Sequence, residues 1–345
     1  MEMKQLLEKC REQAGISVLE HENTTELVYQ NGEDNGSMEF IPLLLGITAA
    51  FIRIRSRSWP APDLTEVTPA GRGLFIINYC VSGRCELLLN DDSYVYVTDN
   101  QASLSENYAR NSYIYPSGLY DGIEFFIDRE AVEQDGTLRR YLSIDMTALA
   151  EKYCQDMRTY IAMAEPELKN EFMTLWKRYE EAGAQADAEM KISVLQILAL
   201  LLKQPVQELR QACTFYTKAQ VTIAKEVREI LSADLTAHYS ARKLAERYAI
   251  SESSLKNYFR GVYGRNISEY RNELRMKKAA ELLCFTRLSV LEIAMRTGYQ
   301  NQSKFAAAFK RTYAMSPREY RLKNSLATPE GKSLVDDETS QKYNG

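Results

Sequence analysis

The sequence contains very little histidine, and this limits the chemistry that it can perform. His21 and His238 are the only two histidines among 345 residues, and neither falls in a segment that we predict to be a strand. Metal centres in small β-barrels take two or three histidines from neighbouring strands. The chain also lacks a phosphate-cradling glycine loop, a G-x-S-x-G motif and a Cys/His pair at suitable positions. We therefore predict a protein that is not an enzyme and that uses no metal and no cofactor.

Long apolar runs and paired cysteines are absent as well. The longest apolar run, 197–202, is far too short to span a bilayer, and the charged first residues do not resemble a signal peptide. Six cysteines occur without a C-x-x-C pair, so neither a zinc ribbon nor a disulfide framework is indicated. We expect a cytoplasmic protein with reduced cysteines and no membrane segment.

The net charge of −4 hides an asymmetry between two parts of the chain. Residues 221–323 carry 20 Lys/Arg and 10 Asp/Glu, which leaves 23 Lys/Arg and 37 Asp/Glu for all other residues. A basic segment in an otherwise acidic chain indicates a polyanionic partner for that segment alone.

The segment 289–321 has the pattern of short helices joined by tight turns. Ser289 and Glu292 have the spacing of a capping box, in which the two side chains each satisfy a backbone N–H and start a helix. Gly298 tolerates a positive φ and allows a sharp turn. Phe305 and Phe309 then recur at i, i+4 and mark the buried stripe of a second helix, whose other face is polar. This pattern is typical of a helix-turn-helix, although a surface helical hairpin would also fit this segment alone.

A second copy of the pattern lies about fifty residues upstream. Residues 241–248 supply its first helix, 249–250 the turn, and Ser251 the N-cap of its second helix. The end of the copy, 259–271, then repeats in 309–321, which indicates a duplicated unit. The repeated positions are Phe259 and Phe309, Tyr263 and Tyr313, Tyr270 and Tyr320, and Arg271 and Arg321.

The doubled pattern resembles the paired helix-turn-helix module of the AraC/XylS transcription regulators. The second half of that module reads I-A-x-x-x-G-F, F-x-x-x-F-K and P-x-x-Y-R, and the resemblance covers the last third of this chain. The chain departs from the family at Ala314, where glycine is usual, and at Ala249 in the first turn. The matching positions are Ile293, Ala294, Gly298, Tyr299, Phe305, Phe309, Lys310, Pro317, Tyr320 and Arg321.

This resemblance implies partners and a mode of action. It implies a sequence-specific, ligand-responsive activator that binds double-stranded DNA and helps to recruit RNA polymerase. It also implies a small-molecule effector and a homodimer formed through helices that adjoin the sensor. Two alternatives stay open: a barrel enzyme fused to a DNA-binding module, which the scarcity of histidine disfavours, and a ligand-independent architectural DNA binder.

Upstream of the module, the composition changes twice. Phe40 to Asp128 is rich in short β-runs separated by turn residues, which favours a barrel or sandwich. The resemblance implies a cupin-like barrel here. From 145 the pattern becomes helical. We therefore predict a multidomain chain with an N-terminal arm at 1–39 that starts with an amphipathic helix, a cupin-like β-barrel sensor at 40–144, a helical connector and dimerisation region at 145–217, an all-α double helix-turn-helix DNA-binding domain at 218–324, and a disordered tail at 325–345.

Two features of these regions leave alternatives open. The helix around 192–202 is apolar on nearly all sides, so it is buried within its own domain or against a two-fold partner. If Ser82 and Gly83 form a two-residue hairpin turn, Cys80 lies opposite Cys85. A cross-strand disulfide is then conceivable, but a reducing cytosol favours two small buried thiols.

Polar residues on the two recognition helices are predicted to read bases, although a merely solvated helix face would look similar. Asparagine pairs bidentately with adenine, and lysine pairs with the guanine acceptors of the major groove. Ala307 cannot hydrogen-bond a base, so the second helix should read less sequence than the first. The predicted base-reading residues are Ser253, Lys256 and Asn257 in the first copy and Gln302, Ser303 and Lys304 in the second.

Basic residues around these helices are predicted to contact phosphates and to fix the register without reading sequence. Arg275 and Arg321 could equally bind partners inside the protein. The helix between the copies, about 268–284, spans roughly 25 Å. This length is compatible with two recognition helices about one DNA turn apart. The predicted phosphate contacts are Arg260, Arg271, Arg275, Lys310, Arg311 and Arg318.

The effector site is less well marked by the sequence. Asn78, Tyr79, Arg84 and Glu86 lie on predicted strands and could orient a ligand. Neighbouring strand residues point to opposite faces, so at most one of Asn78 and Tyr79 points inward. An ordinary core or surface role fits these four residues as well.

Overall fold

The chain forms two units in the computed structural model: Met1–Val221 with Gly261–Gly264, and Thr222–Arg260 with Arg265–Gly345. The structure describes residues 10–11, 15–60, 74–89, 91–106, 114–154, 159–206 and 213–325. Most of the helix predicted for 1–15, and the tail predicted to be disordered beyond 325, lie outside the described residues. No helix in the described ranges is both long and apolar enough to cross a membrane.

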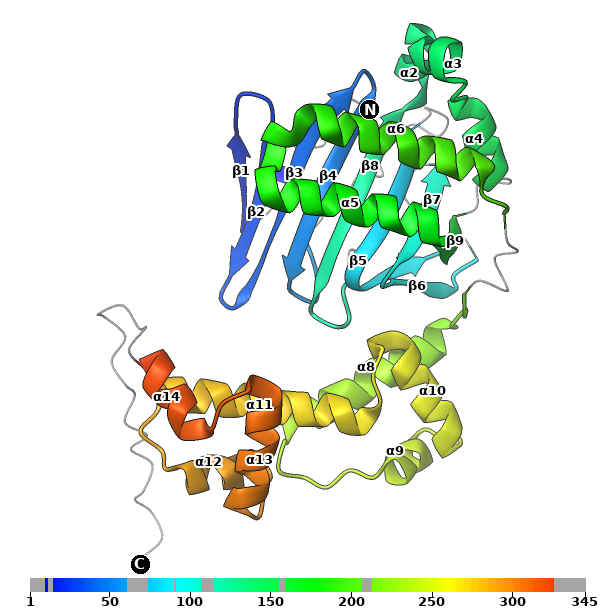
Figure 1. The fold of residues 1–345 in the computed structure, drawn as a ribbon. Coiled ribbons are helices and arrows are strands. Elements are labelled where there is room, and N and C mark those ends of the chain that lie inside the picture. The colour runs from blue at the N-terminus through cyan, green and yellow to red at the C-terminus, as the bar shows by residue number, and fades with distance from the viewer. Residues whose placement is uncertain are drawn as a thin grey trace, which may run out of the picture. The chain divides into compact units, whose positions relative to one another are not determined.

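The first unit is built on an antiparallel sheet (Figure 1). The strand order is β1-β2-β3-β4-β8-β5-β7-β9, and β6 pairs with β5. The described end strands β1 and β9 do not pair, so the sheet is not closed and the predicted cupin-like barrel is not confirmed. The strands are β1 (Ile16–Glu20), β2 (Thr25–Asn31), β3 (Asp34–Leu44), β4 (Ile47–Arg55), β5 (Leu74–Leu88), β6 (Tyr94–Thr98), β7 (Gln101–Glu106), β8 (Tyr120–Asp128) and β9 (Tyr160–Met163).

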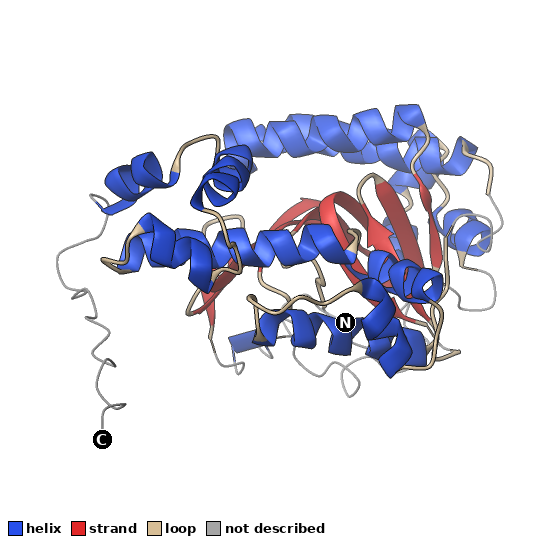
Figure 2. Ribbon diagram, turned by 90° about the horizontal axis from the view of Figure 1, so that it is seen from below, coloured by secondary structure: helices blue, strands red, loops and turns tan. Residues whose placement is uncertain are grey.

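Helices cover one face of this sheet, which we call the helix face (Figures 1 and 2). Alternate strand residues point to it, and the rings of Tyr79 and Phe51 stack on Phe172 and Tyr179 of α5 at 4.3 and 3.8 Å. The strand residues between them point to the other side, the opposite face. The helices of this unit are α2 (Arg129–Asp135), α3 (Thr137–Leu142), α4 (Met146–Tyr153), α5 (Pro166–Ala182), the 3-10 turn η2 (Gly183–Ala186) and α6 (Asp187–Lys203).

The structure decides where the apolar helix packs. Met190, Val194 and Ile197 of α6 are fully buried in the same core as the sheet residues of the helix face. Ile192, on the other side of α6, is 58% exposed. The apolar stripe of this helix is therefore buried within its own unit.

Two strand assignments needed correction. The sheet begins at Ile16 and not at Phe40, because β1, β2 and the first part of β3 form two hairpins in the segment that we described as an arm. Tyr160–Met163, which we included in a helical pattern, pairs with Gln101–Leu104 of β7 as a strand. The second error concerns a strand whose pairing partner lies in a distant segment, where local periodicity says little.

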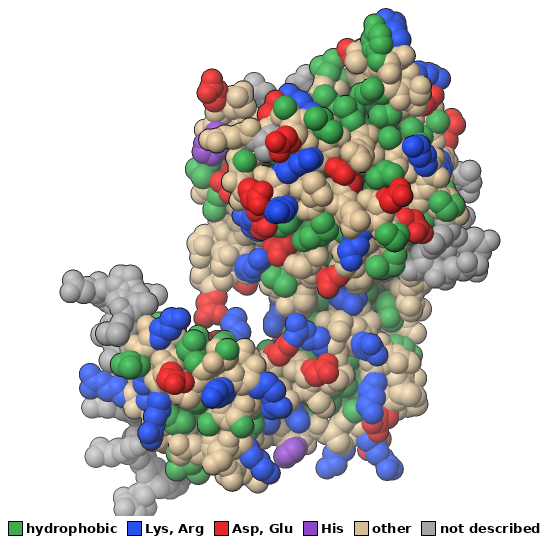
Figure 3. Space-filling model, in the orientation of Figure 1, with side chains coloured by type: hydrophobic (Ala, Val, Ile, Leu, Met, Phe, Trp, Pro, Cys, Tyr) green, Lys and Arg blue, Asp and Glu red, His purple; other side chains and the backbone are tan. Residues whose placement is uncertain are grey.

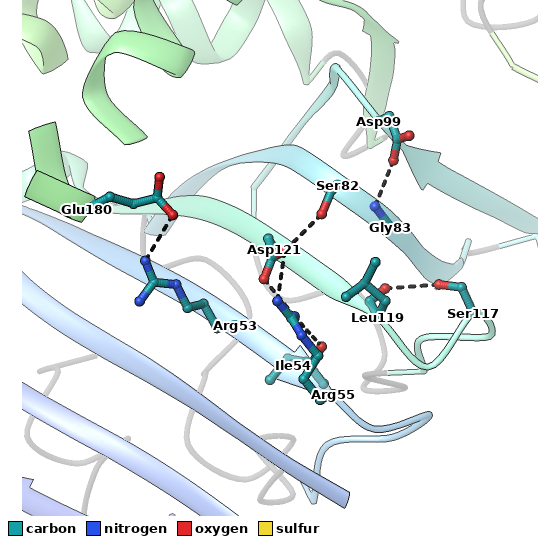
Figure 4. Close-up of polar contacts among 10 residues, drawn as sticks. All are labelled: Arg53, Ile54, Arg55, Ser82, Gly83, Asp99, Ser117, Leu119, Asp121 and Glu180. Carbon is teal, nitrogen blue, oxygen red and sulfur yellow. Dashed lines mark hydrogen bonds and ion pairs between the residues drawn. The ribbon is translucent and has the colours of Figure 1, made fainter. Parts of the chain in front are cut away.

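The predicted hairpin turn at Ser82 and Gly83 is wrong. Strand β5 continues through both residues, with a bulge between Cys80 and Ser82, and keeps β8 as its partner. The Ser82 hydroxyl donates to Asp121 at 2.9 Å, and the Gly83 N–H donates to Asp99 at 2.7 Å (Figure 4). Cys80 and Cys85 are consequently not opposite each other. Both are buried free thiols, which agrees with the alternative of two small buried thiols and not with a disulfide.

The second unit is a helical module arranged around the long helix α11. Figure 1 shows the pair α9 and α10 near one end of α11, and the pair α12 and α13 near the other. Phe305 and Phe309 pack in the core of the second pair with residues of α11. The helices are α8 (Lys218–Ala233), α9 (Ala241–Arg247), α10 (Glu252–Tyr263), α11 (Ile267–Phe285), α12 (Val290–Arg296), α13 (Gln302–Tyr313) and α14 (Pro317–Ser325).

Candidate nucleic-acid interface

Side-chain caps start the helices of the second helix-turn-helix. Ser289 and Glu292 form the predicted capping box: the Glu292 N–H donates to the serine oxygen at 3.2 Å, and the Ser289 N–H donates to the glutamate at 2.7 Å. Asn301 caps α13 by accepting from the N–H groups of Ser303 and Lys304 at 2.8 and 3.2 Å. These bonds satisfy N–H groups that have no partner within the helix, so they fix where α12 and α13 begin.

The first helix-turn-helix uses simpler caps. Ser240 caps α9, and Ser251 caps α10 as predicted, accepting from the Ser254 N–H at 3.0 Å. Leu255 and Phe259 of α10 are fully buried. The opposite face of α10 is therefore fixed in a solvent-facing orientation.

The two turns share one backbone conformation. Ala249 and Gly298 adopt φ values of +53° and +78°, in the left-handed region that favours glycine. Ala314, the other departure from the family pattern, has a φ of +57°. Alanine therefore occupies left-handed positions at both departures, and the turn geometry is retained.

All six predicted base-reading residues lie on exposed faces of α10 and α13. Lys256 is paired with Glu252 at 2.5 Å, but this ion pair is exposed and easily exchanged. Neither Asn257 nor Gln302 makes a side-chain hydrogen bond within the described part of the chain, so their amides are available. The exposed residues are Ser253, Lys256, Asn257, Gln302, Ser303 and Lys304, together with Ala307.

Most of the predicted phosphate contacts are also accessible. Arg260, Lys310, Arg311 and Arg318 are exposed, and Figure 3 shows many Lys and Arg side chains on the helical module. Arg271 is half-buried and donates to the Tyr239 carbonyl at 3.3 Å. Four of the six residues are thus free to meet a phosphate without rearrangement.

The prediction that Arg275 contacts a phosphate needs correction. Its side chain is only 5% exposed, its Nε donates to the Leu235 carbonyl at 2.8 Å, and its guanidinium lies 5.6 Å from the ring centroid of Tyr299. Burial lowers the pKa of this guanidinium. Arg275 therefore holds α11 against neighbouring segments and does not face a phosphate. Arg321 likewise donates inward, to the carbonyls of Leu283 and Leu288.

The four nominated effector residues do not form one site. Tyr79 is fully buried on the helix face, whereas Asn78 points to the opposite face and accepts from the Tyr120 hydroxyl at 2.6 Å. Glu86 is buried and accepts from Tyr96 at 2.9 Å, and the Arg84 guanidinium lies 5.5 Å from the centroid of the same ring. In the described parts of the chain, no group of three or more His, Cys, Asp or Glu residues could hold a metal ion.

Two residues of interest were missed by the sequence analysis. Asn301 caps the recognition helix α13. Its position between the turn and the polar run that follows could have identified it as the cap. Glu124 is a half-buried carboxylate in the centre of the sheet, next to Asn78. Its signal was a single acidic residue inside an otherwise apolar run, Ile123 to Ile127.

The helical module is similar to domains of known proteins. A family model described as a helix-turn-helix domain matches residues 244–323. The transcriptional activator AarP of Providencia stuartii is 30% identical over 110 residues, which are 32% of this chain and 82% of that protein. The transcriptional activator RhaR of Enterobacter sp. (strain 638) is 32% identical over 97 residues, 28% of this chain and 34% of that protein.

A solved structure is similar to part of this chain. The C-terminal domain of AraT, a response regulator from Geobacillus stearothermophilus, has 27% identity and a TM-score of 0.29, and the match covers 35% of this chain and 93% of that one. The match with RhaR spans about a third of that relative's length, so it does not extend to the whole protein. The match covers most of AarP and, together with the helix-turn-helix domain, it shows that the chain belongs to the AraC/XylS family of transcription regulators.

Proposed function

We propose that this protein is a ligand-responsive transcriptional activator that binds two successive major-groove segments of double-stranded DNA with each chain. The observation that carries the proposal is the pair of recognition helices, α10 and α13, with polar exposed faces on either side of α11. The 19 residues of α11 span roughly 28 Å at the standard helical rise. This length is suited to helices placed about one DNA turn, roughly 34 Å, apart.

In this proposal the two helices contribute unequally to sequence readout. Helix α10 presents Lys256 and Asn257, whose side chains can pair bidentately with guanine and adenine. Helix α13 presents Gln302, Ser303 and Lys304. Ala307, which is also exposed, has no side-chain donor or acceptor and cannot hydrogen-bond a base. Arg260, Lys310, Arg311 and Arg318 would then fix the register through phosphates.

The remaining parts of the proposal concern regulation. Residues 218–324 would form the DNA-binding domain, and the sheet unit would bind a small-molecule effector and support homodimerisation in the cytoplasm. The names of AarP and RhaR describe activators, which supports activation through RNA polymerase over repression. Footprinting with and without effector would separate this proposal from a ligand-independent architectural DNA binder.

The salt dependence of DNA binding tests the proposal on the full-length chain. With on the order of 6 to 10 phosphate contacts, affinity for a labelled duplex should fall about a thousandfold or more between 50 and 200 mM salt. Arg260→Ala should reduce the logarithmic salt slope by about 1. Lys177→Ala removes an exposed cation from the sheet unit and should leave the slope unchanged. A flat salt response of the unmodified chain would refute the proposal.

A further inference from the structure

The opposite face of the sheet carries a row of polar side chains in an apolar setting. Strand pairing places Ala50, Glu124, Asn78 and Ser103 side by side on β4, β8, β5 and β7. Adjacent strands lie about 4.8 Å apart, so Glu124, Asn78 and Ser103 fall within about 10 Å. Three neighbouring polar residues in the middle of a sheet face indicate a place where something polar binds.

The surroundings of this row are apolar and aromatic. The buried residues of the same face include Phe40, Ile52, Ile76, Phe126 and Tyr120. Phe40 and Phe126 contact each other at 5.7 Å between ring centroids. Ala50, paired with Glu124 on β4, is the smallest side chain of the row. The arrangement resembles ligand sites in general, with hydrophobic walls and a few convergent polar groups.

Among the residues that the structure describes, Glu124 has no partner that would neutralise its charge. It makes no hydrogen bond or ion pair with any residue that the structure describes, whereas Asn78 is oriented by the Tyr120 hydroxyl at 2.6 Å. Burial raises the pKa of Glu124 to about 7. A carboxyl in this setting is poorly solvated and would gain from a cation or a donor brought by a ligand.

The titratable side chains that the described strands place around Glu124 are not cations, so they cannot neutralise the carboxylate. Strand β5 contributes the thiols Cys80 and Cys85, whose pKa values are raised above the usual range mainly by burial. Strand β8 contributes Tyr120, whose pKa is also raised by burial. Strand β4 contributes Ala50 at the paired position. These neighbours are neutral at physiological pH, so the site has a negative end only when Glu124 ionises.

We propose that Glu124 and Asn78 form the recognition end of a binding site for a small organic amine, whose ammonium pairs with the carboxylate and whose apolar body lies against the aromatic side chains of the opposite face. This proposal rests on the proposed ligand-responsive function and names its ligand class. An ammonium supplies up to three donors, which suits the Glu124 oxygens and the remaining acceptor capacity of Asn78. Nearby aromatic rings further favour a cation.

A melting screen of the full-length chain tests the ligand class. The probes are primary amines of four to eight carbons, each paired with the alcohol and the carboxylic acid of the same skeleton. An amine should raise the melting temperature where its alcohol and acid do not, because a ligand that binds only the native state stabilises it by mass action. Equal shifts from an amine and its alcohol, or no shift from any amine at millimolar concentration, would overturn the proposal.

A matched pair of variants assigns the effect to Glu124. Glu124→Gln keeps the shape and should weaken binding of the best amine at least tenfold in calorimetry. Glu39→Gln makes the same change on the helix face, where Glu39 accepts from Tyr179 at 2.7 Å, and should leave the affinity unchanged. Undiminished binding in Glu124→Gln would place the amine elsewhere and contradict the assignment.

The pH dependence supplies a second readout that needs no ligand. The folded-state pKa of Glu124 is raised from 4.5 to about 7, so the folded protein loses stability as Glu124 ionises between these pH values. Glu124→Gln should therefore melt above the unmodified chain at pH 8, and the difference should vanish below pH 4.5. In the unmodified chain, amine affinity should increase from pH 5.5 to 8. A pH-independent difference in melting would show that Glu124 is not desolvated, and this would overturn the site.

The outcomes distinguish this proposal from the broader one. If an alcohol or an acid binds and alters DNA binding, the ligand-responsive activator stands and the amine site fails. If the amine binds to Glu124 but DNA binding is insensitive to salt, the activator proposal fails alone.

Discussion

The two helix-turn-helix copies of this protein reach the same turn with different residues. Ala249 and Gly298 both adopt a left-handed conformation, but Ala249 is exposed. At Gly298, a Cβ atom would lie 2.5 Å from both the Leu235 carbonyl oxygen and Nη2 of Arg275. The backbone conformation is thus common to both copies, whereas the need for glycine comes from packing around the second copy alone.

The copies also differ on the faces that they present to solvent. Helix α10 offers Lys256 and Asn257 from the first copy, and α13 has Ala307 at an exposed position of the second. Both copies have two capped helix starts, but only the second has a full capping box at the start of its first helix, at Ser289. The comparison suggests that the first copy contributes more to base recognition and the second more to rigid placement.

The largest expected effect comes from Gly298→Ala. The new Cβ would clash with the Leu235 carbonyl and would also occupy a left-handed position, so we expect a loss of about 3 kcal/mol in the free energy of unfolding. Urea denaturation followed by circular dichroism measures this change. The reverse substitution in the first copy, Ala249→Gly, should stabilise the protein slightly. Equal losses from both substitutions would mean that the two turns are packed alike.

The next effect concerns base recognition. Asn257→Ala should cost about 1 to 3 kcal/mol of specific binding and relax the preference at one base position, because a bidentate contact is lost. Gln302→Ala should cost less. A binding matrix of both variants against single base substitutions in a selected site measures the difference. Equal or larger losses from Gln302→Ala would reverse the ranking of the two copies.

The smallest expected effect is at Ala314. Glycine is favoured at a φ of +57°, so Ala314→Gly should stabilise the protein by about 0.5 to 1 kcal/mol. Ala307→Gly, in the interior of the neighbouring helix, should destabilise it by a similar amount because glycine is a poor helix former. Thermal unfolding of the two variants should therefore move in opposite directions. Movement in the same direction would show that the left-handed alanine carries no strain.

The sequence was most informative where the structure depends on local signals. The caps at Ser251 and Ser289 and the apolar stripes at Phe259 and Phe309 concern residues within four positions of one another. The helical module could therefore be predicted from motif spacing. The exposure of Asn257 and Gln302 followed from the same periodicity.

Residues whose environment depends on distant segments could not be placed in this way. Strand β5 passes through Ser82 and Gly83 because Asp121 of β8 and Asp99 of the turn between β6 and β7 accept their hydrogen bonds. Arg275 is buried because Leu235, forty residues earlier, accepts its hydrogen bond. Glu124 faces Asn78 only through the pairing of β8 with β5. Long-range strand pairing and tertiary burial are not encoded in short patterns, and these errors share that cause.

The most direct test of the central claim is hydroxyl-radical and methylation footprinting of the full-length chain on a selected binding site. If α10 and α13 each enter a major groove, one chain should protect two major-groove segments about one helical turn, roughly 10 base pairs, apart on one face of the duplex. Asn257→Ala should weaken protection in one segment more than in the other. Protection of a single segment per chain would contradict the account.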